Sequence, residues 1–180
     1  MKLMIASDLH GSAYYTEKLI EAMQLEKPDQ VVLLGDLLYH GPRNELPRDY
    51  APKQVIAMLN RIREKLLCVR GNCDAEVDQM VLDFPILAEY ALLYWDGLII
   101  HAVHGHKNLS MPVQSGSLIL CGHTHVPAIR EIDGHFCANP GSVAIPKENS
   151  AHGYMVLQDR TLIHKCLEPG QTLDPFTFPK

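Results

Sequence analysis

The sequence lacks the features that mark secreted, membrane-spanning and strongly basic proteins. Its five cysteines are odd in number and contain no CxxC pair, so a disulfide framework is not expected. No apolar run approaches the roughly 18 residues that a membrane span needs, and Asp8 follows directly on the short apolar start. We therefore expect a cytoplasmic protein with no membrane partner.

Positive charge is also scarce along the chain. The 180 residues carry a formal net charge of −5, and no long basic run is present. This balance argues against a protein dedicated to binding nucleic acid. The length suits one globular domain with a sizeable core, so we expect residues 1–180 to form a single domain.

The first half of the chain alternates apolar and amphipathic segments. Apolar strands are predicted at 2–7, 30–36 and 66–72, and amphipathic helices at 14–26 and 52–65. Strands that are apolar on both faces, joined by helices, predict right-handed crossovers and a parallel sheet.

The second half consists mainly of predicted strands. Asp96-Gly97, Asp133-Gly134 and Asp159-Arg160 lie between apolar runs and predict hairpins within 90–106, 128–142 and 154–167, with a further strand at 117–125. We expect these segments to form a second, mixed sheet, which gives one α/β domain with two packed sheets.

Polar residues gather where five of the predicted strands end. The first three strands end in S-D-L-H-G, L-G-D-L and R-G-N-C-D, and two later ones end in V-H-G-H and C-G-H-T-H. Ligand sites in parallel α/β sheets lie beyond the carboxyl ends of the strands. The carboxylate, amide and imidazole groups supplied there belong to Asp8, His10, Asp36, Asn72, His104, His106, His123 and His125.

This mixture of side chains is typical of a metal site. The pairs 8/10, 104/106 and 123/125 are two residues apart, so both members of a pair point the same way in an extended chain. Imidazole with carboxylate and amide oxygen suits Mn²⁺, Fe²⁺, Zn²⁺ or Co²⁺. About seven ligands are too many for one tetrahedral ion but would serve two, which together activate water for displacement at phosphorus.

Each motif taken alone has an ordinary structural interpretation. HxH at a strand end need not bind metal, GD is often a turn or a helix cap, and GNCD is most often a turn. The occurrence of all of them at five strand ends favours the metal site.

The motifs D-L-H, G-D, G-N-C-D, H-G-H and G-H-T-H, in this order, resemble those of the calcineurin-like metallophosphoesterase superfamily. HGPRN (40–44), GNCDAEVDQM (71–80) and NPGSVAIPK (139–147) look most like its small bacterial phosphodiesterases. The resemblance implies a four-layer αββα sandwich of two mixed β-sheets flanked by helices. It also implies a phosphodiesterase with two divalent metal ions per chain, Mn²⁺ first, with Zn²⁺, Fe²⁺, Ni²⁺, Co²⁺ or Mg²⁺ as alternatives.

The resemblance assigns ligands to both ions. Carried over by motif, the first ion would be held by Asp8, His10, Asp36 and His125, and the second by Asp36, Asn72, His104 and His123. Asp36 would bridge the two ions, and a water or hydroxide between them would attack the phosphorus.

One position departs from the superfamily pattern. Many members carry GNH, and that histidine is thought to protonate the leaving oxygen, whereas this chain has Cys73. A thiol with an ordinary pKa of about 8.5 is a poorer acid at neutral pH than imidazolium. We expect a preference for good leaving groups, with His40 and His106 as candidate replacement donors, and we disfavour Cys73 as a covalent nucleophile.

Three charged residues near the motifs have candidate roles. Arg43 and Arg70 are candidates for contacting substrate phosphate, with a structural or solvated role equally open for each. Asp74 is expected to orient a ligand histidine or the 71–74 turn.

The function itself has rivals on the same fold. One is a non-catalytic, metal-binding scaffold for protein interactions, as in the retromer subunit of the superfamily. Others are a phosphomonoesterase and a mononuclear zinc hydrolase. The expected partner is a small phosphodiester substrate, and the loop 39–51 could form a pocket rim or a contact within a homo-oligomer.

Overall fold

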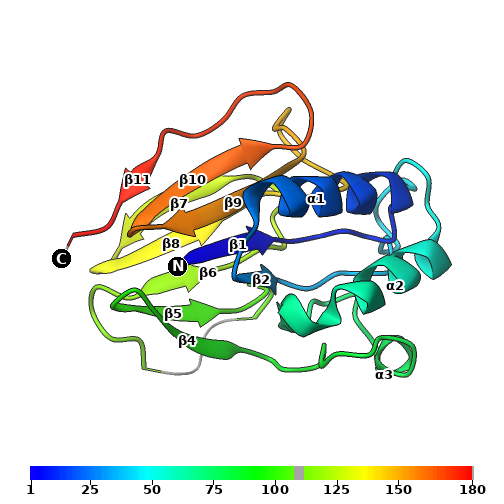
Figure 1. Ribbon diagram of the computed structural model, residues 1–180, viewed down its shortest axis with the longest axis horizontal. Coiled ribbons are helices and arrows are strands. Elements are labelled where there is room, and N and C mark those ends of the chain that lie inside the picture. The colour runs from blue at the N-terminus through cyan, green and yellow to red at the C-terminus, as the bar shows by residue number, and fades with distance from the viewer. Residues whose placement is uncertain (108–111, 180) are drawn as a thin grey trace.

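The computed structural model describes residues 1–107 and 112–179. Figure 1 shows the arrangement of its helices and strands. In chain order they are β1 (Lys2–Ala6), α1 (Ala13–Glu26), β2 (Gln30–Leu33), α2 (Pro52–Arg61), a 3-10 turn (Arg63–Lys65), β3 (Leu66–Cys68), α3 (Glu76–Gln79), β4 (Ala91–Trp95), β5 (Leu98–Ala102), β6 (Leu118–Leu120), β7 (Ala128–Ile132), β8 (His135–Asn139), β9 (Gly153–Gln158), β10 (Thr161–Cys166) and β11 (Phe176–Thr177).

The first sheet has six strands in the order β11-β10-β9-β1-β2-β3. β1 pairs parallel with β2, and β2 with β3, so the predicted parallel sheet is confirmed for these strands. The hairpin β9–β10 pairs with β1 in this sheet. Our assignment of 154–167 to the second sheet was therefore wrong.

The burial of β9 explains why it belongs in the first sheet. Tyr154 and Val156 pack on the helix side of the sheet, whereas Met155 and Leu157 pack between the two sheets. A strand that is apolar on both faces is stable only where both faces are covered. The hairpin turn alone does not reveal which sheet the strand joins.

The second sheet has five strands in the order β4-β5-β6-β8-β7. β5, β6 and β8 pair in parallel, and the hairpins β4–β5 and β7–β8 close the two edges. The turns lie at Asp96-Gly97 and Asp133-Gly134, where all four residues have positive φ. The predicted hairpins at these positions and the mixed sheet are confirmed.

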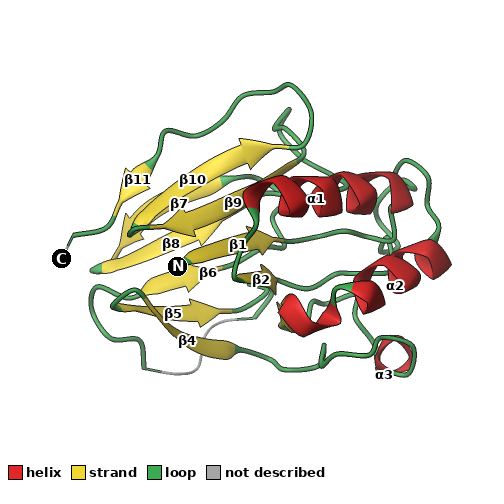
Figure 2. Ribbon diagram, in the orientation of Figure 1, coloured by secondary structure: helices red, strands yellow, loops and turns green. Residues whose placement is uncertain are grey.

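Two apolar clusters hold the layers together. Between the sheets, Ile5 and Leu34 of the first sheet belong to the same cluster as Ile100, Leu118 and Leu120 of the second. On the outer face of the first sheet, the other cluster joins the strands to α1 and α2. Figure 2 shows these helices beside β1 and β2.

The two mixed sheets with flanking helices confirm the expected fold class. Within 1–107 and 112–179, no helix joins the cluster that includes the second sheet. The helices α1 and α2 form a helical layer on the outer face of the first sheet. None of the described helices is long and apolar enough to cross a membrane.

The cluster between the sheets is expected to dominate stability. Leu120 in β6 is fully buried, so Leu120→Ala should lower the free energy of unfolding by about 2–5 kcal/mol through lost burial and a new cavity. Leu92 in β4 is 44% exposed, and Leu92→Ala should cost less than about 1 kcal/mol. Urea unfolding followed by circular dichroism compares the two variants. Equal losses would contradict this account of the core.

Candidate metal centre

The ends of five strands bring the predicted ligands to one place. β1 leads into Asp8 and His10, β2 into Asp36, and β3 into Asn72; from the second sheet, β5 leads into His104 and β6 into His123 and His125. Figure 2 shows the arrowheads of β1 and β5 pointing toward the same end of the molecule. The ladder between β1 and β2 also continues past the strands, because His10 N donates to Asp36 O at 2.9 Å.

The backbone at these ligands is left-handed rather than extended. Asp8, His10, Asp36, His123 and His125 have φ between 45° and 66°. Our argument from an extended chain was therefore wrong for the pairs 8/10 and 123/125, although their side chains still converge. Non-glycine residues with this backbone cost free energy and persist only where surrounding contacts enforce them. Such concentrated strain points to a functional site.

Asp8, His10 and His125 form the tightest group. Asp8 Oδ1 lies 3.6 Å from His10 Nε2 and 3.3 Å from His125 Nε2, and the two imidazole nitrogens are 3.2 Å apart. All three side chains are buried. Asp8 Oδ1 has no hydrogen-bond partner among the described residues, so a buried charged oxygen faces two ring nitrogens.

Backbone carbonyls fix the orientation of three imidazoles. His10 Nδ1 bonds Tyr39 O at 2.8 Å, and His104 and His125 bond Leu34 O and Ile145 O, each at 2.6 Å. A carbonyl only accepts, so Nδ1 must carry the hydrogen, and in the neutral ring the Nε2 lone pair then faces the cluster. Lone pairs that face each other and a free carboxylate oxygen repel unless a cation lies between them. The donor set therefore fits a metal ion.

Asp36 lies between this group and a second one. Its Oδ2 is 3.8 Å from His10 Nε2 and 3.5 Å from His104 Nε2. Asn72 Oδ1 is 3.1 Å from His104 Nε2, and the His123 ring packs edge-on against His104, with ring centres 5.1 Å apart. The carboxylate thus has the position that a bridging ligand would need.

Electrostatics favour charged carboxylates in the cluster. Burial raises the pKa of Asp8, but the close contacts of its carboxylate with His10 and His125 outweigh burial and hold that pKa below its usual range. Burial likewise opposes ionisation of Asp36, and its contact with His104 still lowers its pKa. Burial lowers the pKa of His104, yet the Asp36 hydrogen bond and nearby carboxylates raise it to about 9. The carboxylates of Asp8 and Asp36 thus favour positive charge at this place.

Asp74 holds the loops that carry Asp36 and Asn72. Its Oδ2 accepts from Asp36 N at 2.8 Å and Gly71 N at 2.7 Å, and its Oδ1 accepts from Leu37 N at 2.9 Å. The expected role in the 71–74 turn is confirmed, and the carboxylate also fixes the loop after β2. One buried side chain therefore sets the separation of two candidate ligands.

Ser7 and Gly122 shape the position of Asp8; the sequence suggested a close backbone approach at Gly122 but gave Ser7 no role. Ser7 Oγ donates to Asp8 Oδ2 at 2.6 Å, and His123 N donates to the same oxygen at 3.1 Å, which leaves Oδ1 as the free atom. A Cβ on Gly122 would lie 2.0 Å from Ser7 Oγ. The serine directly before a ligand aspartate is the only sequence signal for this arrangement.

Cys73 lies at the pocket but as a neutral thiol. Its N donates to Asp36 Oδ1 at 2.8 Å, and its sulfur accepts from Asn72 Nδ2 at 3.3 Å. Burial, together with the charge of Asp36, raises the pKa of the thiol to about 12. A thiolate is disfavoured there, which agrees with our view that Cys73 is not a nucleophile.

The pocket over the cluster has a volume of about 260 Å³. Its lining includes ligand side chains, Cys73, the loop 41–44 and Lys147. Arg43 thus lies where a substrate contact would need it. Sequence reasoning gave Lys147 no role, because a single lysine after a turn motif carries no pattern of its own.

The other candidate residues lie outside this lining. Arg70 bonds Asp74 O through Nε at 3.2 Å and pairs with Glu76 at 3.2 Å, so a structural role suits it. The His106 ring is 5.4 Å from that of His104. The His40 ring stands edge-on to that of Tyr50, with ring centres 5.2 Å apart.

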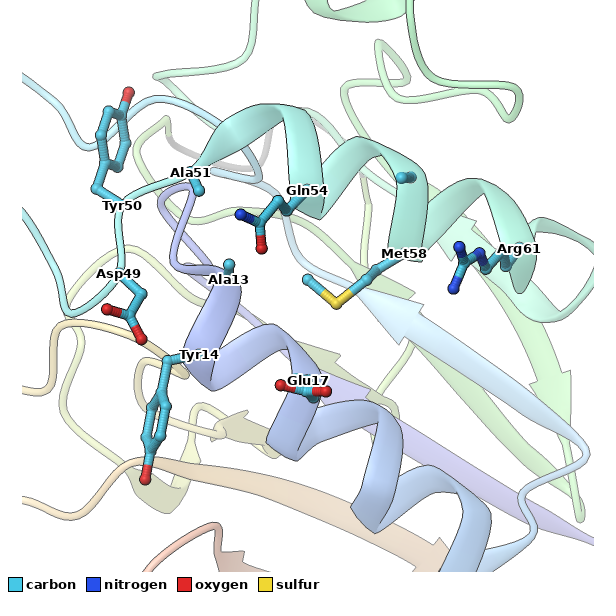
Figure 3. Close-up of a pocket in the computed structure, with 10 residues that line it drawn as sticks. Ala13, Tyr14, Glu17, Asp49, Tyr50, Ala51, Gln54, Met58 and Arg61 are labelled. Carbon is cyan, nitrogen blue, oxygen red and sulfur yellow. The ribbon is translucent and has the colours of Figure 1, made fainter.

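A larger hollow of about 620 Å³ lies between α1 and α2. Figure 3 shows Tyr14, Glu17, Gln54, Met58 and Arg61 around it. No histidine or cysteine lines this hollow among the described residues, so it offers no counterpart to the ligand set. The chemistry of the lining, rather than the volume, locates the candidate site.

A family model for the calcineurin-like phosphoesterase superfamily domain matches residues 1–161. The chain belongs to this superfamily. This membership, together with the ligand groups above, makes it a metal-dependent phosphoesterase, as the resemblance implied.

Named relatives agree with that assignment. Phosphodiesterase YfcE of Escherichia coli is 43% identical over 166 residues, which cover 90% of each chain. The solved structure of that E. coli phosphoesterase has a TM-score of 0.94 and covers 99% of this chain and 100% of its own. Phosphodiesterase MJ0936 of Methanocaldococcus jannaschii is 25% identical, covering 78% of this chain and 83% of its own.

A more distant structural likeness shows the fold alone. A single mutant of Vps29 from Entamoeba histolytica has a TM-score of 0.69 at 19% identity, covering 99% of this chain and 100% of its own. The same architecture therefore occurs with little sequence in common.

Replacing Asp74 tests how the site is held. In Asp74→Asn the amide group can no longer accept three backbone N–H bonds, so Mn²⁺ affinity should fall about 10- to 100-fold. Asp83→Asn, at an exposed position, is the matched control and should bind Mn²⁺ as the parent does. Calorimetric titration of metal-stripped protein measures both. Unchanged affinity in Asp74→Asn would contradict the positioning role.

Proposed function

We propose that this chain hydrolyses small phosphodiesters with two divalent metal ions, Mn²⁺ foremost. Asp8, His10, Asp36 and His125 would hold one ion, and Asp36, Asn72, His104 and His123 the other. The observation that carries the proposal is the position of Asp36, whose Oδ2 lies within 3.8 Å of the Nε2 atoms of both His10 and His104. When bound, such ions activate a water as nucleophile and offset the charge of the phosphoryl group.

The chain's own residues prepare the site for an anionic ester. Carbonyl contacts orient the imidazoles of His10, His104 and His125 toward the cluster, which reduces the rearrangement needed when ions bind. Cys73 N holds one oxygen of Asp36 and leaves the other facing His10 and His104. Arg43 at the pocket lining is available for a charge-assisted bond to a phosphate oxygen.

Diester substrates and an enzymatic role are supported by the relatives. The two curated relatives above are named phosphodiesterases, one at 43% identity over most of both chains. The scaffold alternative has the Vps29 likeness behind it, but that likeness extends to the fold only. A complete ligand set with preset imidazoles favours the enzyme. Phosphomonoesterase activity is the second candidate, because the candidate ligands lie in a pocket of about 260 Å³ that would admit the phosphoryl group of either ester.

Cellular location and assembly stay predictions. The five cysteines are free thiols, which supports our proposal of a reducing, cytoplasmic location. Contact between copies through the loop 39–51 remains an expectation from the sequence.

A panel of esters and metals tests the proposal. Metal-stripped protein should hydrolyse bis(p-nitrophenyl) phosphate after addition of Mn²⁺, with slower turnover of p-nitrophenyl phosphate. Mg²⁺, Zn²⁺ and Ni²⁺ serve as comparison ions. Asp36→Ala should abolish turnover with every metal, because both ligand groups lose the shared carboxylate. Hydrolysis of neither ester with any metal would favour the scaffold, and retained turnover in Asp36→Ala would refute the bridging assignment.

Leaving groups of different pKa test the missing proton donor. If His106 or His40 donates the proton, its replacement by Gln should slow esters of poor leaving groups by about 10²- to 10⁴-fold. Esters of p-nitrophenol, which leaves without protonation, should change little. His135→Gln, on β8 away from the pocket, is the control. Equal losses for both ester types would reject an acid role for that histidine.

A further inference from the structure

Two basic side chains flank the pocket and have no carboxylate partner among the described residues. Arg43 lies in the loop between β2 and α2, and Lys147 lies in the loop between β8 and β9. Both line the same pocket as His10, Asp36 and His125. Among the described residues, neither cation forms an ion pair.

Hydrogen bonds fix the backbone that carries Arg43. Asn44 N donates to Gly41 O at 3.4 Å, and Asn44 Nδ2 donates to His40 O at 2.7 Å. Gly41 has a φ of +80°, which suits this tight turn. The arginine therefore projects from a closed loop beside the pocket.

The backbone of Lys147 is tied directly to a candidate ligand. Lys147 N donates to His125 O at 3.2 Å, while Ser150 N and Ser150 Oγ donate to Lys147 O at 3.0 Å and 2.6 Å. The lysine thus starts from a fixed point next to His125. Because its own side chain is exposed, its charged end is free to contact a ligand at the pocket mouth.

No acidic side chain in the described lining neutralises these two cations at the pocket. Asp36 is the one carboxylate there, and it is committed to His104 and to Cys73 N. Glu148, although next to Lys147, lines a different hollow with Arg130. In a chain of net charge −5, two unpaired cations at one pocket form a local positive region.

The positive charge around the pocket exceeds the charge needed to neutralise a simple phosphodiester. A phosphodiester carries one negative charge, and two divalent ions facing Asp8 and Asp36 would already leave an excess of positive charge. We propose that the natural substrate is a phosphodiester that bears a second phosphate group, bound at the pocket mouth by Arg43 and Lys147. This inference rests on the function proposed above and narrows its substrate class.

The size of the pocket agrees with this arrangement. Its volume of about 260 Å³ lies below the usual range for sites that enclose a whole drug-sized ligand. The scissile phosphate and its nearest substituent would fill it, and the remainder of the substrate would extend to the mouth. A second phosphate would then lie beside the two loops.

A matched pair of substrates tests the inference. The p-nitrophenyl ester of thymidine 5′-phosphate is compared with the same ester carrying a 3′-phosphate, so that leaving group and scissile bond are identical. With Mn²⁺-loaded protein, kcat/KM should be about 10- to 100-fold higher for the phosphorylated ester, as expected for charge-assisted bonds to a phosphate. The combined variant R43Q/K147Q should reduce this ratio to near one.

A control separates specific contact from general attraction of anions. K53Q/R63Q removes the same charge from exposed positions on and after α2, away from the pocket. It should leave the ratio unchanged. A ratio near one in the parent protein, or an equal fall of the ratio in both double variants, would overturn the inference. Hydrolysis of neither ester would instead overturn the proposed function itself.

Discussion

The burial of two carboxylates among inward-facing imidazoles is the interaction on which this structure depends. Asp8 and Asp36 are almost inaccessible to solvent, and desolvation opposes the charge of each. Histidine contacts outweigh that penalty and keep both pKa values low. Buried charges persist only when they are paired or bind a cation. The two buried carboxylates therefore create a negative potential in the site, which a proton on His104 or bound metal ions would neutralise.

The surrounding fold supplies the rigidity that this arrangement needs. Left-handed backbone at five candidate ligands costs stability, and it is held by Asp74, Ser7 and backbone bonds between the loops. Behind these loops lies the apolar cluster between the two sheets, where Leu34, Leu118 and Leu120 are fully buried. The loops can be strained because the strands that carry them are firmly packed.

The sequence predicted the convergence of the candidate ligands because strand ends and metal chemistry both leave local signals. Asp8, Asp36 and His125 each follow an apolar run, and parallel strands end at one edge of a sheet. Ser7, Lys147 and the carbonyls of Leu34 and Ile145 were not predicted, since their roles depend on contacts between distant segments. For the same reason β9 was placed in the wrong sheet: its two-sided burial is decided by the layers around it.

Cys73 stands where the sequence motif of many superfamily members has a histidine. The neutral thiol offers no acid of useful strength, and neither His40 nor His106 lines the pocket. Ester cleavage would then rely on the metal ions, on the oriented imidazoles that hold them and on a leaving group that departs without protonation. A substrate held by a second phosphate would supply binding energy that such a site can use for orientation.

Electron paramagnetic resonance of protein loaded with Mn²⁺ tests the shared carboxylate most directly. If Asp36 joins the two ions, each chain should bind two Mn²⁺ ions, and their spectrum should be that of a spin-coupled pair. Asp36→Asn should convert that spectrum to one of isolated ions with reduced occupancy. A single ion per chain, or two uncoupled ions in the parent protein, would contradict the account.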